Sequence, residues 1–417
     1  MPRSPRRAAA VTAVLLGAAA AACAGPPPAG DRPVPGPAGS SPAAAGPPAL
    51  VLAPAAPVAP PAGRPAAKRA FTLVASGDVL PHDSVIRRAR LDSEDGGYDF
   101  APMLAGVRPV VSAADLAICH METVYGADGD YRGYPAFTSP PQVARGLADT
   151  GYDSCSTASN HSLDDGAEGI RRTLDALDAA GVGHTGSART ESEARTPAWL
   201  AARGARVAQL AYTYGTNGYP LPEGQPWAVA PMERDRILAD ARAARRAGAD
   251  VVVVSLHWGT EWQTEPDEIQ RELARGLTAA GPADRPDIDL IIGTHAHVPQ
   301  AYEKVNGTWV VYGMGDQIAG PMFNHSGGFD ARGNQGSIAR FTFAPPLPPL
   351  RPDARWEVRR AEFIPQLMDI GAGRVINVAD ALDRGADRDD YREALESVRT
   401  AVLSRGASAD GLTMSSR

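Results

Sequence analysis

Residues 289–298 read Asp289-Leu290-Ile291-Ile292-Gly293-Thr294-His295-Ala296-His297-Val298, an apolar run that ends in glycine and is followed by two histidines. The run is too short for a helix and is typical of a buried parallel strand. We expect the next loop to present His295 and His297 at the strand's C-terminal end, where open α/β sheets bind ligands. The two imidazoles are either a metal site, on one ion or two, or a pair of solvated loop histidines.

The same pattern recurs elsewhere in the chain. Apolar strand candidates run directly into Gly77-Asp78, His120-Met121-Glu122, Ser159-Asn160-His161, His257-Trp258-Gly259 and Gly313-Met314-Gly315-Asp316. Each strand candidate therefore delivers a carboxylate, an amide or an imidazole at its C-terminal end. Because such ends meet at one edge of a parallel sheet, the repetition predicts a single site.

The chemistry of this site follows from its side chains. The candidate metal ligands are Asp78, Glu122, Asn160, His257, His295 and His297. A mixed set of oxygen and nitrogen ligands suits Mn, Zn or Fe better than Ca or Mg, which prefer oxygen alone. Six protein ligands are too many for one tetrahedral zinc and fit two divalent ions that share a carboxylate. Two metals about 3.5–4 Å apart stabilise the attacking and leaving oxygens in phosphoester displacement.

Size and composition limit the remaining possibilities. The chain has 417 residues and a formal net charge of -7, which argues against a basic nucleic-acid binder. It is long enough for one large α/β domain with appendages or for two domains. Of the three cysteines, Cys119 and Cys155 lie inside apolar strand candidates. We expect both to be free, buried thiols rather than a disulfide or a catalytic group.

The N-terminal part has the composition of an export segment and a linker. Three arginines precede an uncharged run at residues 8–22, which is too short to span a bilayer comfortably. Cys23 follows three alanines and resembles a lipoprotein processing site, although Ala20 stands where leucine is usual. We expect residues 1–23 to direct export, with a lipid anchor on Cys23 rather than plain cleavage or an uncleaved anchor. Residues 24–69 are dominated by Pro, Ala and Gly and are predicted to be a disordered spacer.

From residue 70 onward, strand candidates alternate with helical stretches, which predicts a largely parallel sheet. The helical stretches are residues 100–114, 141–149, 164–180, 232–247 and 266–279. After Asp316, residues 337–343 and 356–363 alternate polar with apolar and are expected to be antiparallel strands. Residues 70–370 are therefore predicted to form one domain. Residues 371–417 are predicted to add a helix at 389–403 and a disordered tail.

In this order and spacing, the motifs resemble the CapA poly-γ-glutamate capsule-synthesis protein family, and Phe137-Thr138-Ser139-Pro140 adds to the likeness. That family has a calcineurin-like metallophosphoesterase fold, and the resemblance covers roughly residues 70–320. It implies a four-layer αββα sandwich of the metallo-dependent phosphatase type with a dinuclear metal site between the sheet ends. By matching motifs, the resemblance implies that Glu122 bridges the two ions. One ion would be bound by Asn160, His257 and His295, and the other by Asp78 and His297. His161 would be the catalytic acid at the leaving group.

Three departures from the family pattern concern this site. Metallophosphoesterases usually have Asp-x-His at the first motif, whereas Leu80 stands two residues after Asp78 and the nearby His82 is the candidate substitute. His120 and Asp316 each stand where the family usually has asparagine. These two departures indicate altered contacts around the ligands or the substrate.

The sequence therefore predicts an exported, lipid-anchored protein at the outer face of the cytoplasmic membrane or the cell surface. It would act in the synthesis or handling of a cell-surface polymer, poly-γ-glutamate by resemblance, through a dinuclear-metal hydrolytic site. Its expected partners are the membrane, the polymer and other capsule-synthesis membrane proteins, but not nucleic acid. Two alternatives stay open: a general metal-dependent phosphoesterase at the cell surface, and a non-catalytic polymer-assembly factor, because a fold does not fix a substrate.

Overall fold

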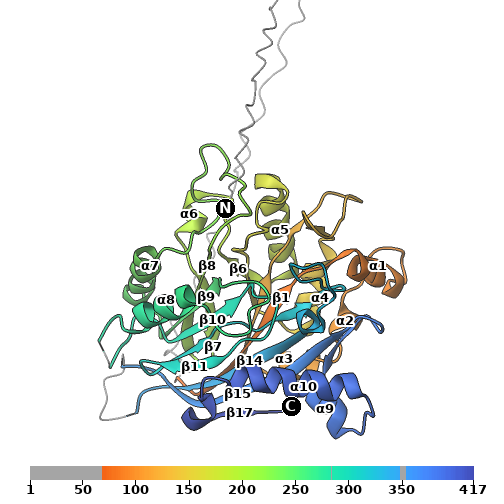
Figure 1. Cartoon of the computed structure of the whole chain (residues 1–417). Helices are drawn as coiled ribbons and strands as arrows, with labels where there is room; N and C mark the ends of the chain where they lie inside the picture. The colour runs from red at the N-terminus through yellow and green to blue at the C-terminus, as the bar shows by residue number, and fades with distance from the viewer. Residues whose placement is uncertain (1–67, 283, 348–353) are drawn as a thin grey trace, which may run out of the picture. The chain divides into compact units, whose positions relative to one another are not determined.

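Two β-sheets form the centre of the fold (Figure 1). The computed structural model describes residues 68–282, 284–347 and 354–417. The expected export segment, its anchor on Cys23 and nearly all of the predicted spacer lie outside these described residues.

The first sheet has nine strands. In spatial order they are β16 (Arg374–Asn377), β15 (Glu357–Asp369), β14 (Gln335–Ala344), β1 (Phe71–Val79), β2 (Leu116–Met121), β5 (Ser154–Ser156) and β6 (Gly183–Thr185), with β13 (Asp316–Ile318) beside β1 and β17 (Leu412–Met414) beside β15. Strands β1, β2, β5 and β6 are parallel, whereas β14, β15 and β16 pair antiparallel. The antiparallel pair predicted after Asp316 is confirmed as β14 and β15.

The second sheet has six strands. Their order is β11 (Tyr302–Val305), β12 (Thr308–Val311), β10 (Leu290–Thr294), β9 (Val251–His257), β8 (Ala205–Thr213) and β7 (Ala198–Ala202). The central strands β8, β9, β10 and β12 are parallel, and the two edge strands are antiparallel to their neighbours. A separate short pair is formed by β3 (Val124–Tyr125) and β4 (Thr138–Ser139).

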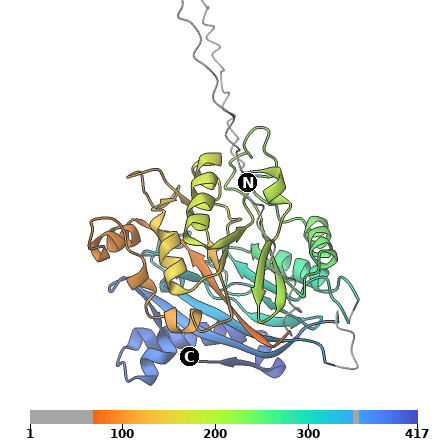
Figure 2. The same ribbon diagram turned by 180° about the vertical axis from the view of Figure 1, so that it is seen from behind.

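Alternate side chains of the strands pack into different cores, as the pleat of a strand requires. On β9, Val251 and Val253 belong to the core between the two sheets, whereas Val252 and Val254 face helices. The helices packed on the first sheet are α1 (Asp83–Asp92), α2 (Ala101–Leu104), α3 (Arg108–Val111), α4 (Gln142–Thr150) and α5 (Gly166–Ala180), and those on the second are α7 (Arg234–Arg246) and α8 (Glu268–Thr278) (Figure 2). The expected four-layer αββα sandwich of the metallo-dependent phosphatase type is confirmed.

One helical stretch differs from its prediction. Residues 100–114 form the short helices α2 and α3 in place of one longer helix. Pro102 and Pro109 each lie in the first turn of their helix, where the missing N–H costs nothing. Within one continuous helix Pro109 would be an interior residue and would remove a backbone hydrogen bond, so the chain starts a second helix there.

The C-terminal segment is an integral part of the sandwich. Val398 and Val402 of α10 (Asp389–Leu403) pack into the core between the sheets, and α9 (Val378–Asp383) lies beside α10 (Figure 1). The expectation of a disordered tail is wrong, because residues 412–414 form β17 parallel to β15 and Leu412 is buried. The segment α6 (Glu191–Ala194) is a single turn on the surface.

A disulfide joins Cys119 on β2 to Cys155 on β5. The two residues are direct partners in the parallel register of these strands. The expectation of two free thiols is therefore wrong, because strand pairing brings together cysteines that are 36 residues apart in the sequence. Among the described residues, no helix combines the length and apolar composition that a membrane span needs.

The packing of β17 predicts different effects for two of its residues. Replacing Leu412, which is 2% exposed, by alanine should lower the free energy of unfolding by about 2–5 kcal/mol, as expected for a cavity in a packed core. Met414 is 40% exposed, so Met414→Ala should change it by less than about 0.5 kcal/mol. Urea denaturation of both variants measures the difference. Equal, small effects would mean that β17 does not pack on the sheet.

Candidate metal centre

The sequence-predicted site residues gather at the C-terminal ends of parallel strands from both sheets. Those at this edge are Asp78 on β1, His120 and Glu122 at the end of β2, Asn160 and His161 after β5, His257 on β9, His295 and His297 after β10, and Asp316 on β13. All of them are buried. The structure thus brings carboxylates, imidazoles and an amide into one region that is closed to bulk water.

Two glycines allow neighbouring strand ends to approach each other closely at this site. A Cβ atom on Gly77 would lie 1.7 Å from the carbonyl oxygen of Gly315, and one on Gly293 would lie 2.1 Å from the carbonyl oxygen of Tyr312. A side chain at either position would push neighbouring strands apart. Gly77 therefore lets β1 and β13 run side by side, with the residue after it in register with Asp316.

The loop after β10 holds its two histidines in an unusual backbone conformation. His295 and His297 have φ angles of 93° and 57°, in the left-handed region that costs a non-glycine residue roughly 1–3 kcal/mol. The backbone N–H of His295 donates to Oδ2 of Asp78 at 3.1 Å. The backbone N–H of Trp262 donates to the carbonyl oxygen of Ala296 at 2.9 Å. These contacts keep both imidazoles at the site in spite of the strained backbone.

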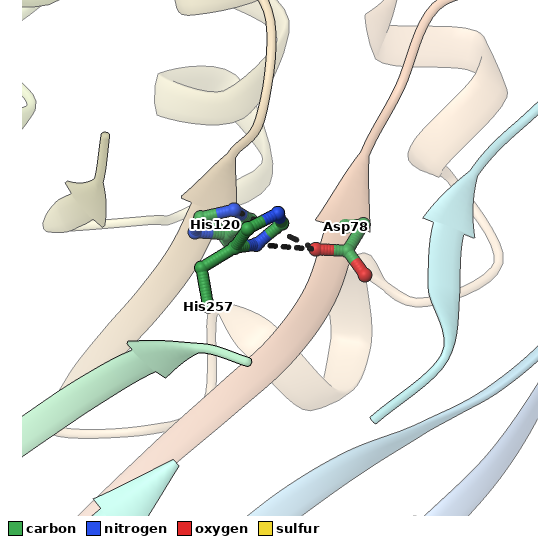
Figure 3. Close-up of side chains that lie close together, drawn as sticks. All are labelled: Asp78, His120 and His257. Carbon is green, nitrogen blue, oxygen red and sulfur yellow. Dashed lines mark ion pairs between the residues drawn. The ribbon is translucent and has the colours of Figure 1, made fainter. Parts of the chain in front are cut away.

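Three overlapping groups of side chains place their ligand atoms within 4.8 Å of one another. The groups are Asp78 with His120 and His257, Asp78 with Glu122 and His297, and Glu261 with His295 and His297. Figure 3 shows the imidazoles of the first group pointing toward the carboxylate of Asp78; His120 Nε2 lies 3.6 Å and His257 Nδ1 lies 3.9 Å from its Oδ1. Asp78 and His297 each belong to two groups, whereas the expected bridging residue Glu122 belongs to one.

Several buried polar atoms at this site have no hydrogen-bond partner within the part of the chain that the structure describes. They are Oδ1 of Asp78, Nε2 of His120, both carboxylate oxygens of Glu122, Nδ1 of His295 and Oδ2 of Asp316. A buried polar atom without a partner costs about 1–3 kcal/mol. Divalent cations would satisfy carboxylate oxygens and imidazole nitrogens together, so the residues fit the metal ions that the sequence predicts.

Polar neighbours hold the imidazole rings in place. Nδ1 of His297 lies 2.9 Å from Oδ1 of Asp316, which leaves Nε2 as the ligand atom. Nδ1 of His120 lies 2.7 Å from Oγ of Ser156. Such a contact on the second ring nitrogen is the usual way in which proteins orient a metal-binding histidine. Asp316 therefore orients a ligand, whereas His120 presents its own Nε2 to the site.

His257 is held from both sides. Its Nδ1 lies 3.0 Å from Oγ1 of Thr294, and its Nε2 lies 2.8 Å from Oδ1 of Asn160 and 3.8 Å from Oε1 of Glu122. His257 belongs to the second sheet, whereas Asn160 and Glu122 follow strands of the first sheet. Its imidazole thus joins the two sheets at the site.

The carboxyl groups are difficult to ionise in the metal-free protein. Burial raises the pKa of Asp78 to about 8, and the charge of Asp316 adds to the effect. Burial, and then the charge of Asp78, raises the pKa of Glu122 well above its usual range. Burial also raises the pKa of Asp316. A cation at the centre would reverse these shifts, because an opposite charge favours the carboxylate form.

Most of the histidines are held in the neutral form that binds metals. Burial lowers the pKa of His120 to about 3 and lowers the pKa of His257 and His295 well below the usual range. Burial acts to lower the pKa of His297 as well, but the adjacent carboxylates, first that of Asp316, hold it well above the usual range. Metal binding at His297 would therefore release a proton.

His161 is buried and is paired with a carboxylate. Its Nδ1 is 2.6 Å from Oδ2 of Asp164, an oxygen that also accepts the backbone N–H of Phe137 at 2.7 Å. The edge of the ring contacts Phe137, with 4.8 Å between the ring centroids. Asp164 was not predicted from the sequence, although its position three residues after His161 is the available signal.

The candidate substitute His82 also packs against the ring of Phe137. Its centroid is 5.1 Å from that of Phe137, and its Nδ1 is 3.0 Å from the carbonyl oxygen of Leu80. The backbone N–H of Gly320 lies 3.1 Å from the same nitrogen. Burial lowers the pKa of His82 to about 4. His82 is in none of the three ligand groups found among the described residues.

Sequence reasoning also missed Glu261 and Tyr214. Glu261 joins His295 and His297 in the third ligand group, although it lies in the loop after β9 and follows no strand directly. Tyr214 follows β8 and is half-exposed, with its ring centroid 4.5 Å from that of His295. Tyr214 directly follows a strand, but its phenol is not a common metal ligand, so the strand-end pattern does not single it out.

Comparison with known proteins gives a family match over most of the folded part. Residues 72–321 match the family described as bacterial capsule synthesis protein PGA_cap. The chain is 26% identical over 217 residues to the PGA biosynthesis protein CapA of Bacillus subtilis (strain 168), covering 51% of this chain and 55% of that protein. It is 27% identical over 181 residues to the capsule biosynthesis protein CapA of Bacillus anthracis, covering 42% of each.

A third relative is a probable polyglutamine synthesis accessory protein of Mycobacterium tuberculosis (strain ATCC 25618 / H37Rv), 28% identical over 225 residues, which are 50% of this chain and 56% of that protein. The chain thus spans about half the length of the curated relatives it matches. Among solved structures, a putative 5'-nucleotidase of Staphylococcus aureus has a TM-score of 0.45 at 15% identity, with 79% of this chain and 58% of that chain covered. The NAD nucleotidase of Haemophilus influenzae has a TM-score of 0.41 at 13% identity, covering 84% and 64%.

The raised carboxyl pKa values predict how metal stabilisation depends on pH. The pKa of Asp78 in the folded protein lies above its ordinary value, so the stability that its protonated form contributes is lost as pH rises toward about 8. Between about pH 6.5 and about pH 8.5, the metal-free chain should therefore lose stability while metal affinity rises, because fewer protons compete. The increase in Tm on adding Mn²⁺ should be larger at the higher pH.

The control is Asp78→Asn, which cannot ionise. In this variant the metal-free Tm should vary less with pH than in the wild type, and the Mn²⁺ effect should be small at both pH values. An equal Mn²⁺ effect at the two pH values in the wild type would contradict the assigned titration.

Proposed function

The chain belongs to the bacterial capsule synthesis protein PGA_cap family, and on that basis we propose that it acts in the synthesis or handling of a cell-surface polymer through a dinuclear-metal hydrolytic centre. Two relatives are named for PGA biosynthesis and for capsule biosynthesis, and the resemblance of the motifs implies poly-γ-glutamate as the polymer. The observation that carries the proposal is the buried set of carboxylates and imidazoles without partners among the described residues.

In the proposed mechanism the metal ions are held by Asp78, Glu122, Asn160, His257, His295 and His297. A pair of divalent ions supplies Lewis-acid activation at such a site. The burial of these side chains excludes bulk water, which strengthens every electrostatic interaction inside. Asp316 keeps His297 in its ligand orientation through the contact with Nδ1.

His161 is the proposed general acid. Asp164 accepts the Nδ1 proton of the ring, so Nε2 is the atom that gives a proton to the leaving oxygen. Histidine is the side chain that most often serves as a general acid in enzymes. Phe137 packs against the edge of the ring and fixes its plane. This arrangement supports a hydrolase more than a binding protein, because a polymer-binding surface has no need of a buried His–Asp pair.

We further propose that the protein is exported and anchored to the outer face of the cytoplasmic membrane or the cell surface through Cys23. The disulfide between Cys119 and Cys155 supports export, because disulfides persist mainly in oxidising compartments. In that position the polymer and other capsule-synthesis membrane proteins are the proposed partners. The formal net charge of -7 disfavours nucleic acid as a partner.

Metal content tests the proposed centre directly. The purified chain, loaded with Mn²⁺ or Zn²⁺ and freed of excess, should carry about two ions, and the double variant His295→Ala/His297→Ala should bind them at least about tenfold more weakly. Elemental analysis with parallel assays on phosphodiesters, phosphomonoesters and γ-glutamyl amides gives the answer. Two ions with hydrolysis support the enzyme. A wild-type chain that binds no metal would identify a non-catalytic assembly factor instead.

The role of His161 is tested by His161→Ala and His161→Asn. Loss of a general acid should lower turnover on the best substrate roughly 10²–10⁴-fold, with metal content and Tm nearly unchanged. His184→Asn is the control, since His184 lies on β6 and contacts Asp178 outside the centre. If turnover stays within a few-fold of wild type while Tm falls, His161 has a structural role in its loop.

A further inference from the structure

The motif at Gly77-Asp78 supplies one metal ligand, Asp78, whereas the corresponding Asp-x-His motif of metallophosphoesterases supplies two. Leu80 occupies the position of the missing histidine and packs with Phe137, Ala319 and Met322 in a small apolar cluster. Its side chain is 3% exposed and offers no donor atom. The centre is therefore one ligand short of the expected set unless another residue replaces it.

His82 does not fill this role in the structure. Its Nδ1 lies at hydrogen-bonding distance from backbone atoms of Leu80 and Gly320, and its ring packs against Phe137. In the described part of the chain it belongs to no group of ligand atoms. The nearest histidine in the sequence is thus not the replacement.

Glu261 is better placed than His82. It follows β9 by a few residues, and a carboxylate oxygen lies within 4.8 Å of the ligand atoms of His295 and His297. Nδ1 of His295 is buried and has no hydrogen-bond partner among the described residues. A carboxylate beside two imidazoles is a common ligand set for a divalent transition-metal ion.

The backbone fixes Glu261 in this position. The next residue, Trp262, has a φ of 67°, and its N–H donates to the carbonyl oxygen of Ala296, between the two histidines. Three non-glycine residues with positive φ therefore face one another across this contact. Strained backbone of this kind persists where the surrounding structure holds it and is concentrated at functional sites.

We propose that Glu261 is the replacement ligand and that it binds one divalent ion of the centre together with His295 and His297. The other ion is bound by Asp78, His120 and His257, and Glu122 and Asn160 of the proposed ligand set lie beside His257. His297 serves one ion only, because its Nδ1 is engaged by Asp316. The assignment rests on the proposed metal centre and divides the ligands differently from the family pattern, with His120 as a ligand.

The two ions are expected to differ in how easily they exchange. The Glu261 side chain is 29% exposed, whereas those of Asp78, His120 and His257 are 0–2% exposed. A chelator should therefore remove the ion at Glu261 first. The ion at Asp78 should follow more slowly, because its ligands are closed to solvent.

The experiment measures metal content and the absorption of bound Co²⁺ in the full chain. Glu261→Gln removes the charge but keeps the shape, and it should leave about one ion per chain, with affinity for the second at least about tenfold lower. Glu261→Asp should keep both ions. His82→Gln should also keep both, and Glu265→Gln, in the same loop and paired with Arg405, is the matched control.

Each outcome separates the inference from the proposed function. Two ions in the wild type and one in Glu261→Gln, with a changed Co²⁺ spectrum and an unchanged Tm of the metal-free chain, support the assignment. Two tightly bound ions in Glu261→Gln, or loss of one ion in His82→Gln, would overturn the assignment while the metal centre itself stands. A wild-type chain without metal would overturn both.

Discussion

Three fully buried carboxyl groups set the main constraint on this structure. Asp78, Glu122 and Asp316 lie within one region closed to water, where ionised carboxylates repel one another and lack solvation. Among the described residues, the contacts that favour their charged forms are the imidazole of His297 and the backbone N–H of His295. For all three groups to ionise, further positive charge is needed. The proposed divalent ions would provide it.

The two sheets make this crowding possible. Each contributes parallel strands whose C-terminal ends meet at one edge, and a shared apolar core holds the sheets together behind the site. Glycine at positions 77 and 293 lets strand ends approach more closely than any side chain would allow. Apolar packing therefore stabilises the strands independently of the ionisable side chains. It holds these side chains in place even where their charges repel one another.

Sequence patterns predicted what depends on local periodicity. The apolar runs before Asp78 and His257 identified parallel strands, and the rule that their ends share one edge placed these residues together. The patterns could not predict contacts made by pairing between distant strands, such as Cys119 with Cys155, or the packing of Leu412 on the sheet. The position of Glu261 could not be predicted either, because it lies in a loop that no strand leads into directly. Only the folding of that loop brings it to His295 and His297.

The disulfide between β2 and β5 joins the two strands directly before residues of the proposed metal centre. Cys119 and Cys155 come directly before His120 and Ser156, which contact each other at 2.7 Å. In a reducing compartment these strands are held by their hydrogen bonds and by their shared apolar core, without the covalent link. Once oxidation joins the sulfurs, the ends that carry His120 and Asn160 are tied to one another covalently. In an exported chain, oxidation would therefore add a covalent link between the two strands just behind the proposed ligand His120.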